Sequence, residues 1–140
     1  MKFITLILVL FVILFHIGVF VAESFLWMQP FIHEFAIEKL KAGVNVEVYD
    51  QALVLKKLFY NQGFYNLFLA LGGVAGLIAM ARGKVTTGCA LIMYMCLFAT
   101  GAGLILAISA QAYIGAFMQG GVAAMAFLMV AFGGLGKAES

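Results

Sequence analysis

The chain has 140 residues, of which 66% are hydrophobic and 10% charged, and its formal net charge is +2. Soluble domains contain about 45–50% apolar and about 25% charged residues, so a water-soluble fold of this size would lack the polar side chains to cover its surface. The small net charge and the lack of a basic stretch interleaved with aromatic residues argue against a nucleic-acid partner. Composition therefore predicts an integral membrane protein.

Four apolar stretches are long enough to cross a hydrocarbon core of about 30 Å as helices, which takes about 20 residues each. They cover approximately residues 3–28, 58–81, 86–109 and 113–135. None alternates polar and apolar residues as a barrel strand does. The first stretch exceeds the ~7–15 apolar residues of a signal peptide, so we expect it to be retained as a helix. The sequence predicts an all-α, up-down, four-helix transmembrane bundle that forms one domain over residues 1–140.

The connections between these stretches differ greatly in length. Residues 82–84 and the segment around Gln111 are short links, which make antiparallel neighbours of the helices they join. The connection of residues 29–57 has room for structure, and its mixed apolar and charged first half favours a short interfacial helix. Its later half, around Val44 to Val48, predicts either an extended piece or a second helix on the membrane surface. Lys and Arg divide equally between the two sides, and the short basic link at 82–84 favours cytoplasmic termini.

Strongly polar residues gather in the half of the bundle that faces the 29–57 connection, which we call the loop side. On the first helix, His16, Glu23 and Trp27 are seven and four residues apart and share one face. The second helix opens with the polar run 61–66, and the fourth has Gln119 near its start. A carboxylate at membrane depth is costly without a partner, so we expect Glu23 to lie at the centre of a site. The candidate ligand-binding residues are His16, Glu23, Trp27, Asn61, Gln62, Tyr65, Asn66 and Gln119.

Each of these residues also has an ordinary structural explanation. In this explanation, Glu23 is solvated near the headgroups and His16 is hydrogen-bonded to a neighbouring helix. The amides then join helices at about 0.6 kcal/mol per bond. Trp27 is then an anchor in the aromatic belt of the membrane interface. The convergence of the residues favours a site over these separate explanations. The sequence contains no spacing typical of metal ligands, phosphate loops or nucleophile motifs, so no metal and no cofactor is predicted, and these motifs assign no catalytic residue.

Three functions from different classes fit this pattern. The leading hypothesis is that an amphipathic or hydrophobic small molecule, or a lipid, binds in a loop-side cavity. The first alternative is a membrane enzyme in which Glu23 and His16 perform acid–base chemistry, for example on a lipid-like isomerase substrate. The second is a structural protein whose glycine-rich helices form a homo-oligomer. A channel is disfavoured because the half opposite the loop side is almost wholly apolar.

Two sequence elements resemble those of a known family. The run Glu23-Ser24-Phe25-Leu26-Trp27 and the run Asn61-Gln62-Gly63-Phe64-Tyr65-Asn66-Leu67-Phe68-Leu69-Ala70 are similar to elements of the bacterial integral-membrane family catalogued as domain of unknown function 1304. The resemblance extends over the chain in length and number of spans. Phe64 stands where that family often has a smaller aliphatic residue, and the 29–57 connection is longer than is typical. The resemblance implies a multi-pass protein of the bacterial plasma (inner) membrane, without an established activity.

Overall fold

The computed structural model describes residues 2–40 and 45–133, and all regular structure in these residues is helical. This confirms the predicted all-α class. The elements are α1 (Phe3–Ser24), α2 (Pro30–Leu40), α3 (Val48–Ala81), α4 (Val85–Ala110), α5 (Tyr113–Ala116), the π-helix η1 (Phe117–Gly121) and α6 (Val122–Phe132). Four helical stretches are long and apolar enough to cross a membrane: α1, α3, α4, and the continuous run of α5, η1 and α6.

The first helix ends at Ser24, four residues before the end predicted for it. The amides of Phe25 and Leu26 both donate to the carbonyl of Val21, which closes the last turn. Pro30 then opens α2, where its missing amide hydrogen costs no helical hydrogen bond. Because proline also disfavours the helical conformation of the residue before it, α1 cannot continue smoothly into α2.

The third helix begins at Val48, ten residues before the start predicted for its span. The extended alternative for the later half of the 29–57 connection is therefore wrong from Val48 onward, while Val44 lies outside the described residues. Helical spacing explains the difference, because Ala52, Leu55 and Phe59 fall on one face and pack towards α2. At 1.5 Å per residue the 34 residues of α3 reach about 51 Å, well beyond a hydrocarbon core of about 30 Å.

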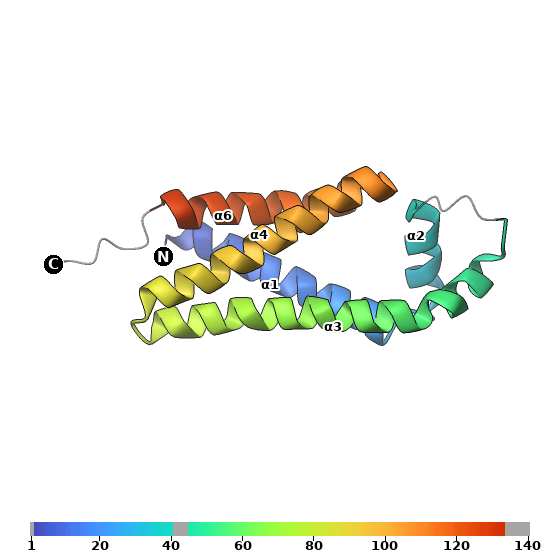
Figure 1. Cartoon of the computed structure of the whole chain (residues 1–140), viewed down its shortest axis with the longest axis horizontal. Coiled ribbons are helices and arrows are strands. Elements are labelled where there is room, and N and C mark those ends of the chain that lie inside the picture. Colours follow the sequence, from blue (N-terminus) through green and yellow to red (C-terminus); the bar gives the residue numbers. More distant parts are fainter. Residues whose placement is uncertain (1, 41–44, 134–140) are drawn as a thin grey trace.

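The four long stretches pack in a closed sequence of contacts. Helix α1 contacts α3, α3 contacts α4, α4 contacts η1 and α6, and α6 contacts α1. Figure 1 shows the start of α1, the end of α3, the start of α4 and the end of α6 at one end of the molecule, with α2 at the other. Gly83 sits in the tight turn from α3 to α4 with φ 78°, a left-handed conformation that favours glycine.

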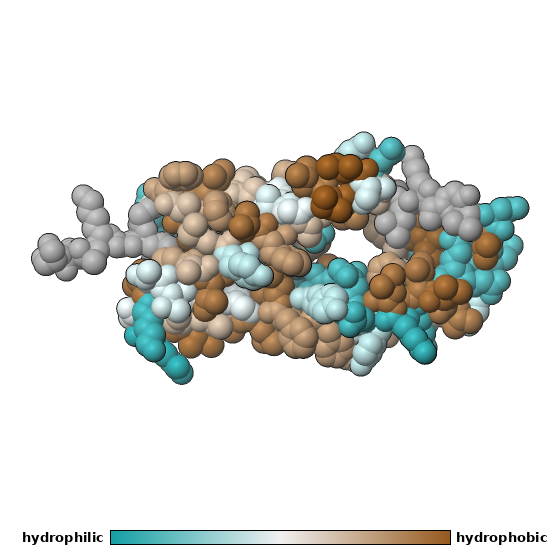
Figure 2. Space-filling model, viewed as in Figure 1, coloured by the Kyte–Doolittle hydropathy of each residue, from teal (hydrophilic) through white to brown (hydrophobic). Residues whose placement is uncertain are grey.

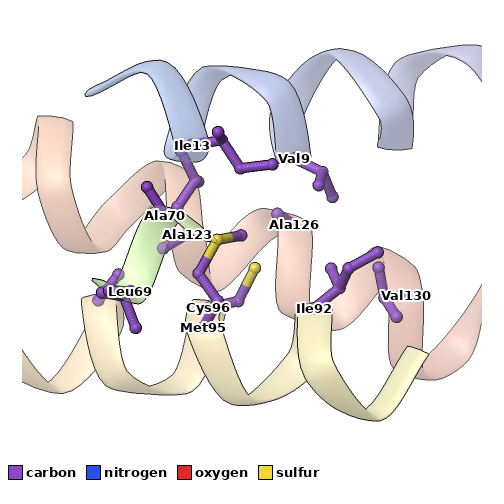
Figure 3. Packing of buried hydrophobic residues seen from close by; sticks show 12 residues of the cluster. Val9, Ile13, Leu69, Ala70, Ile92, Met95, Cys96, Ala123, Ala126 and Val130 are labelled. Atoms are coloured by element: carbon purple, nitrogen blue, oxygen red, sulfur yellow. The ribbon is translucent and has the colours of Figure 1, made fainter. Parts of the chain in front are cut away.

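The buried core runs along the middle of these helices. Figure 3 shows Met95 and Cys96 of α4 pointing between the side chains of α1 and the alanines of α6. Small residues let the helices approach closely, as membrane helices generally do. At the contact of α4 with η1, a Cβ on Gly103 would lie 2.6 Å from the Cα of Gly120, so no side chain fits there. The buried residues of this core are Val9, Val12, Ile13, Leu69, Ala70, Ile92, Met95, Cys96, Ala99, Ala123, Ala126 and Val130.

The fourth stretch ends its described helix at Phe132, and the predicted end at 135 lies outside the described residues. Its start at Tyr113 agrees with the sequence prediction. Within it, η1 interrupts the α-helical geometry at Phe117–Gly121. Short π segments of this kind occur frequently at functional sites, and this one contains Gln119.

Candidate ligand site on the loop side

The centre of the candidate site is a hydrogen bond between α1 and α3. The side-chain amide of Asn66 donates to Oε2 of Glu23 at 3.1 Å, and it also donates to the backbone carbonyl of Gln62 at 3.2 Å. Asn66 is 8% exposed, and Glu23 is half-buried. The structure thus brings together the acid of the first polar element and the last amide of the second.

Gly63 allows α1 and α3 to approach at this level. A Cβ on Gly63 would lie 3.1 Å from the carbonyl oxygen of Phe20 and would collide with the hydroxyl oxygen of Ser24. That hydroxyl donates to the backbone carbonyl of Tyr60 at 3.2 Å, one turn before Gly63. The close contact therefore holds the last turn of α1 against α3 and places Glu23 within reach of Asn66.

The exposure of the side chains of α3 changes one turn before Asn66. Gln62 precedes Asn66 by four residues, so the two side chains are about 40° apart around the helix. Asn66 is nevertheless buried and Gln62 is exposed. Figure 2 shows an opening between the bundle and the segment around α2, with hydrophilic surface over α3 beside it. The Glu23–Asn66 bond therefore lies one helical turn from an exposed position of α3.

Trp27 belongs to a separate cluster at the loop-side end, which we call the cap cluster. Its indole is 3% exposed, donates from Nε1 to the carbonyl of Ala52 at 2.8 Å, and stacks on Phe59 with the ring centroids 3.8 Å apart. The carbonyl of Trp27 is 3.1 Å from Nδ1 of the buried His33. The cap cluster comprises Trp27, Met28, Ile32, Ala36, Ile37, Val48, Ala52, Leu55 and Phe59.

The cap cluster corrects two sequence-based interpretations. An aromatic-belt anchor exposes its ring to the membrane interface, whereas Trp27 is enclosed by protein. The sequence also predicts that His33 and Glu34, in the 29–57 connection, form a solvated pair, whereas His33 lies buried in α2. The i, i+4 spacing of His33 and Ile37 on an amphipathic helix was the one signal in the sequence for a buried position.

His16 lies deeper in the bundle and is 1% exposed. Its Nδ1 is 2.8 Å from the carbonyl oxygen of Val12, so the hydrogen bond stays within α1 and does not reach a neighbouring helix. Because a carbonyl only accepts, Nδ1 carries the hydrogen, and Nε2 of the neutral ring is an acceptor. Among the residues that the structure describes, this buried Nε2 has no hydrogen-bond partner.

Glu23 and His16 share a face of α1 but are seven residues apart, which is about 10 Å along the helix. Each has its own partner, Asn66 for Glu23 and the Val12 carbonyl for His16. The other candidates are more peripheral. Asn61, Gln62 and Tyr65 are exposed, and Gln119 is half-buried in η1. In the described ranges 2–40 and 45–133, no group of three or more His, Cys, Asp or Glu residues is placed to hold a metal ion.

Comparison with known proteins adds one finding. A family model described as protein of unknown function (DUF1304) matches residues 10–131. The match includes α2, α3, α4, α5 and η1 in full and most of α1 and α6, with both polar elements inside it. No curated protein and no solved structure matches the chain.

Proposed function

Because the chain belongs to the family of proteins of unknown function DUF1304, we propose a function from its own site: it binds an amphipathic or hydrophobic small molecule, or a lipid, at the loop-side opening. The observation that carries the proposal is the half-buried carboxylate of Glu23, held by Asn66 where the inner face of α3 becomes exposed at Gln62. That carboxylate accepts one hydrogen bond from Asn66, so acceptor positions on its oxygens remain for a bound molecule.

The depth of the site suits an amphipathic molecule. About 20 helical residues cross the hydrocarbon core, so counting back from Ala81 places the loop-side boundary near Gln62. Asn66 is four residues from Gln62 along α3 and therefore lies about 6 Å inside that boundary. A charge there costs less than at the bilayer centre. The ring of Phe20 contacts those of Phe25 and Phe64, and the three supply an apolar wall.

The proposal includes a membrane arrangement. The four long stretches cross a bacterial plasma membrane as an up-down bundle surrounded by lipid, with both termini in the cytoplasm. Helix α2 then lies at the opposite interface, where the exposed rings of Phe31 and Phe35 meet the boundary between headgroups and acyl chains. The α2 face with His33 and Ile37 stays packed on the cap cluster.

The two alternatives are ranked below binding. Acid–base catalysis by Glu23 and His16 requires the pair to act on one substrate group, but their bonding partners are separate and about 10 Å apart along α1. A purely structural role is supported by the Asn66–Glu23 bond itself, which links two helices. Binding and a purely structural role make different predictions. Only binding predicts a bound molecule whose occupancy depends on the charge of Glu23.

Native mass spectrometry of the protein released gently from membranes tests the proposal. We expect retained lipid or small-molecule adducts on the wild type and a severalfold lower occupancy in Glu23→Gln. Glutamine still offers an oxygen to Asn66, so the variant keeps the interhelical bond and its folding. Glu34→Gln removes the same charge from an exposed position on α2 and serves as the control. Equal occupancy in Glu23→Gln and the wild type would overturn the proposal.

A further inference from the structure

The hydrogen-bond donors of Asn66 and Ser24, the buried and half-buried polar groups that contact the α1–α3 interface beside Glu23, are already used. The side-chain amide of Asn66 has two N–H groups, and both are engaged, one by Glu23 and one by the carbonyl of Gln62. The single O–H of Ser24 is engaged by the carbonyl of Tyr60. Neither Asn66 nor Ser24 therefore has a donor left for a bound molecule.

The groups that remain are acceptors. A carboxylate has two oxygens with about four lone-pair positions, and Asn66 supplies one hydrogen bond to them. The amide oxygen of Asn66 adds a further acceptor. Within the part of the chain that the structure describes, no Lys, Arg or His forms an ion pair with Glu23. The site therefore presents acceptor atoms, with no cationic side chain paired to them among the described residues.

We propose that the molecule bound at Glu23 is a cationic amphiphile whose polar end carries N–H donors, such as a primary ammonium on an alkyl chain. The inference rests on the proposed function and names the chemical class of the ligand. An ammonium supplies both things the site lacks, a positive charge and donors. Hydrogen bonds between ionised partners are about twice as strong as neutral ones, and the low dielectric near the membrane boundary strengthens them further.

The proposal distinguishes between ligands with the same tail. Dodecylamine satisfies the carboxylate fully, and dodecyltrimethylammonium carries the charge without N–H donors. Dodecanol carries a donor without the charge, and dodecanoate adds a second negative charge. We expect affinity to fall in the order amine, trimethylammonium, alcohol and carboxylate, with at least about tenfold between the amine and the alcohol.

Trp27 provides the readout, because it is the one tryptophan of the chain and lies four residues beyond Glu23. The four probes, each with a nitroxide on the alkyl chain next to the polar end, are titrated into the full-length protein in zwitterionic nanodiscs. The saturable part of the quenching of Trp27 fluorescence gives the binding constant, and the linear part reports partition into lipid. In Glu23→Gln we expect the preference for the amine to fall by at least about tenfold, while Glu34→Gln keeps it.

The outcomes separate the two proposals. Saturable, Glu23-dependent binding in the expected order supports both. Saturable and Glu23-dependent binding in which the alcohol or carboxylate equals the amine overturns the assignment of a cationic ligand and leaves the proposed function standing. If Glu23→Gln changes neither the quenching by any probe nor the adducts seen by mass spectrometry, the proposed function fails and the ligand class fails with it.

Discussion

The two ring nitrogens of His16 differ in their hydrogen bonding. Its Nδ1 has the Val12 carbonyl, whereas the buried Nε2 has no partner among the described residues. A buried acceptor without a partner costs about 1–3 kcal/mol, which native proteins seldom accept without reason. The same ring is 1% exposed and packs at an edge against Phe15. An apolar side chain of similar size would fill this buried position equally well.

We therefore expect His16→Leu to keep or raise the free energy of unfolding, by up to about 1–3 kcal/mol, because the uncompensated acceptor is removed. Unfolding in mixed detergent micelles, followed by Trp27 fluorescence, measures the change. Val9→Ala, a truncation at another fully buried position on the same helix, is expected to lower stability and shows that the assay responds to core packing. A large loss of stability in His16→Leu would contradict the expectation and show that Nε2 has a partner in the membrane.

At the scale of elements, the contact between α1 and α3 decides whether the site exists. Gly63 is a point of close approach between the two helices, and the Ser24–Tyr60 and Asn66–Glu23 bonds lie on either side of it along α3. The glycine does not serve a turn, since it lies in the middle of a helix. Its role is to leave room for the backbone of the neighbouring helix, as small residues do in membrane helix packing.

We expect Gly63→Ala to lower the free energy of unfolding by about 1–3 kcal/mol, because the added methyl forces α1 and α3 apart. The increased separation also weakens the Asn66–Glu23 bond, so adduct occupancy in the mass spectrometer falls as well. Gly72→Ala is the matched control on the same helix, because a Cβ there meets nothing within 4 Å. Its stability is expected to stay level or rise slightly with the better helix former. Equal effects of the two substitutions would contradict the close-contact explanation.

The length of α3 is a second feature at this scale. The sequence predicts a span from about residue 58, but the helix continues back to Val48 and carries one side of the cap cluster. Hydropathy locates the segment that is apolar enough to cross a membrane, but it does not mark where the helix begins beyond that segment. The end is set by the packing of Ala52 and Phe59 on Trp27, which is a contact between residues distant in sequence.

At the scale of the whole molecule, the arrangement of the ends makes a prediction about topology. The start of α1 and the α3–α4 turn lie at one end, and α2 lies at the other (Figure 1). In a chain whose Cys89 and Cys96 are replaced by Ala, we expect Asn45→Cys to react with a membrane-impermeant maleimide in intact spheroplasts. Lys84→Cys is expected to react only after the membrane is permeabilised, because short basic links stay in the cytoplasm.

The labelling separates two parts of the membrane arrangement. Reaction of both cysteines from the same side would contradict a four-span up-down crossing. The reversed pattern, with Lys84→Cys exposed and Asn45→Cys protected, would keep the crossing and contradict the cytoplasmic placement of the termini. Untreated and permeabilised samples of the cysteine-free chain provide the background.

Much of the architecture was predictable because it depends on local composition. The all-α class and four helices long and apolar enough to span a membrane follow from hydropathy alone, and the starts of α4 and the fourth stretch lie within one residue of prediction. The membership in the DUF1304 family was predictable from the two polar elements. Within the candidate site, the shared face of His16 and Glu23 followed from spacing. Spacing did not predict that Asn66, among the amides of the second polar element, is the partner of Glu23.

The sequence by itself determined that this protein has the composition of a membrane protein, how many long apolar helices it forms and that its polar residues gather towards one end. These properties depend on each residue's own solvation and on the 3.6-residue period of the helix. Only the tertiary structure decided which polar residues meet. The approach at Gly63 joins Glu23 to Asn66, the cap cluster draws Trp27 away from them, and His16 keeps a bond within its own helix. Such pairings depend on how closely and at what rotation two helices pack, which no single stretch of sequence specifies.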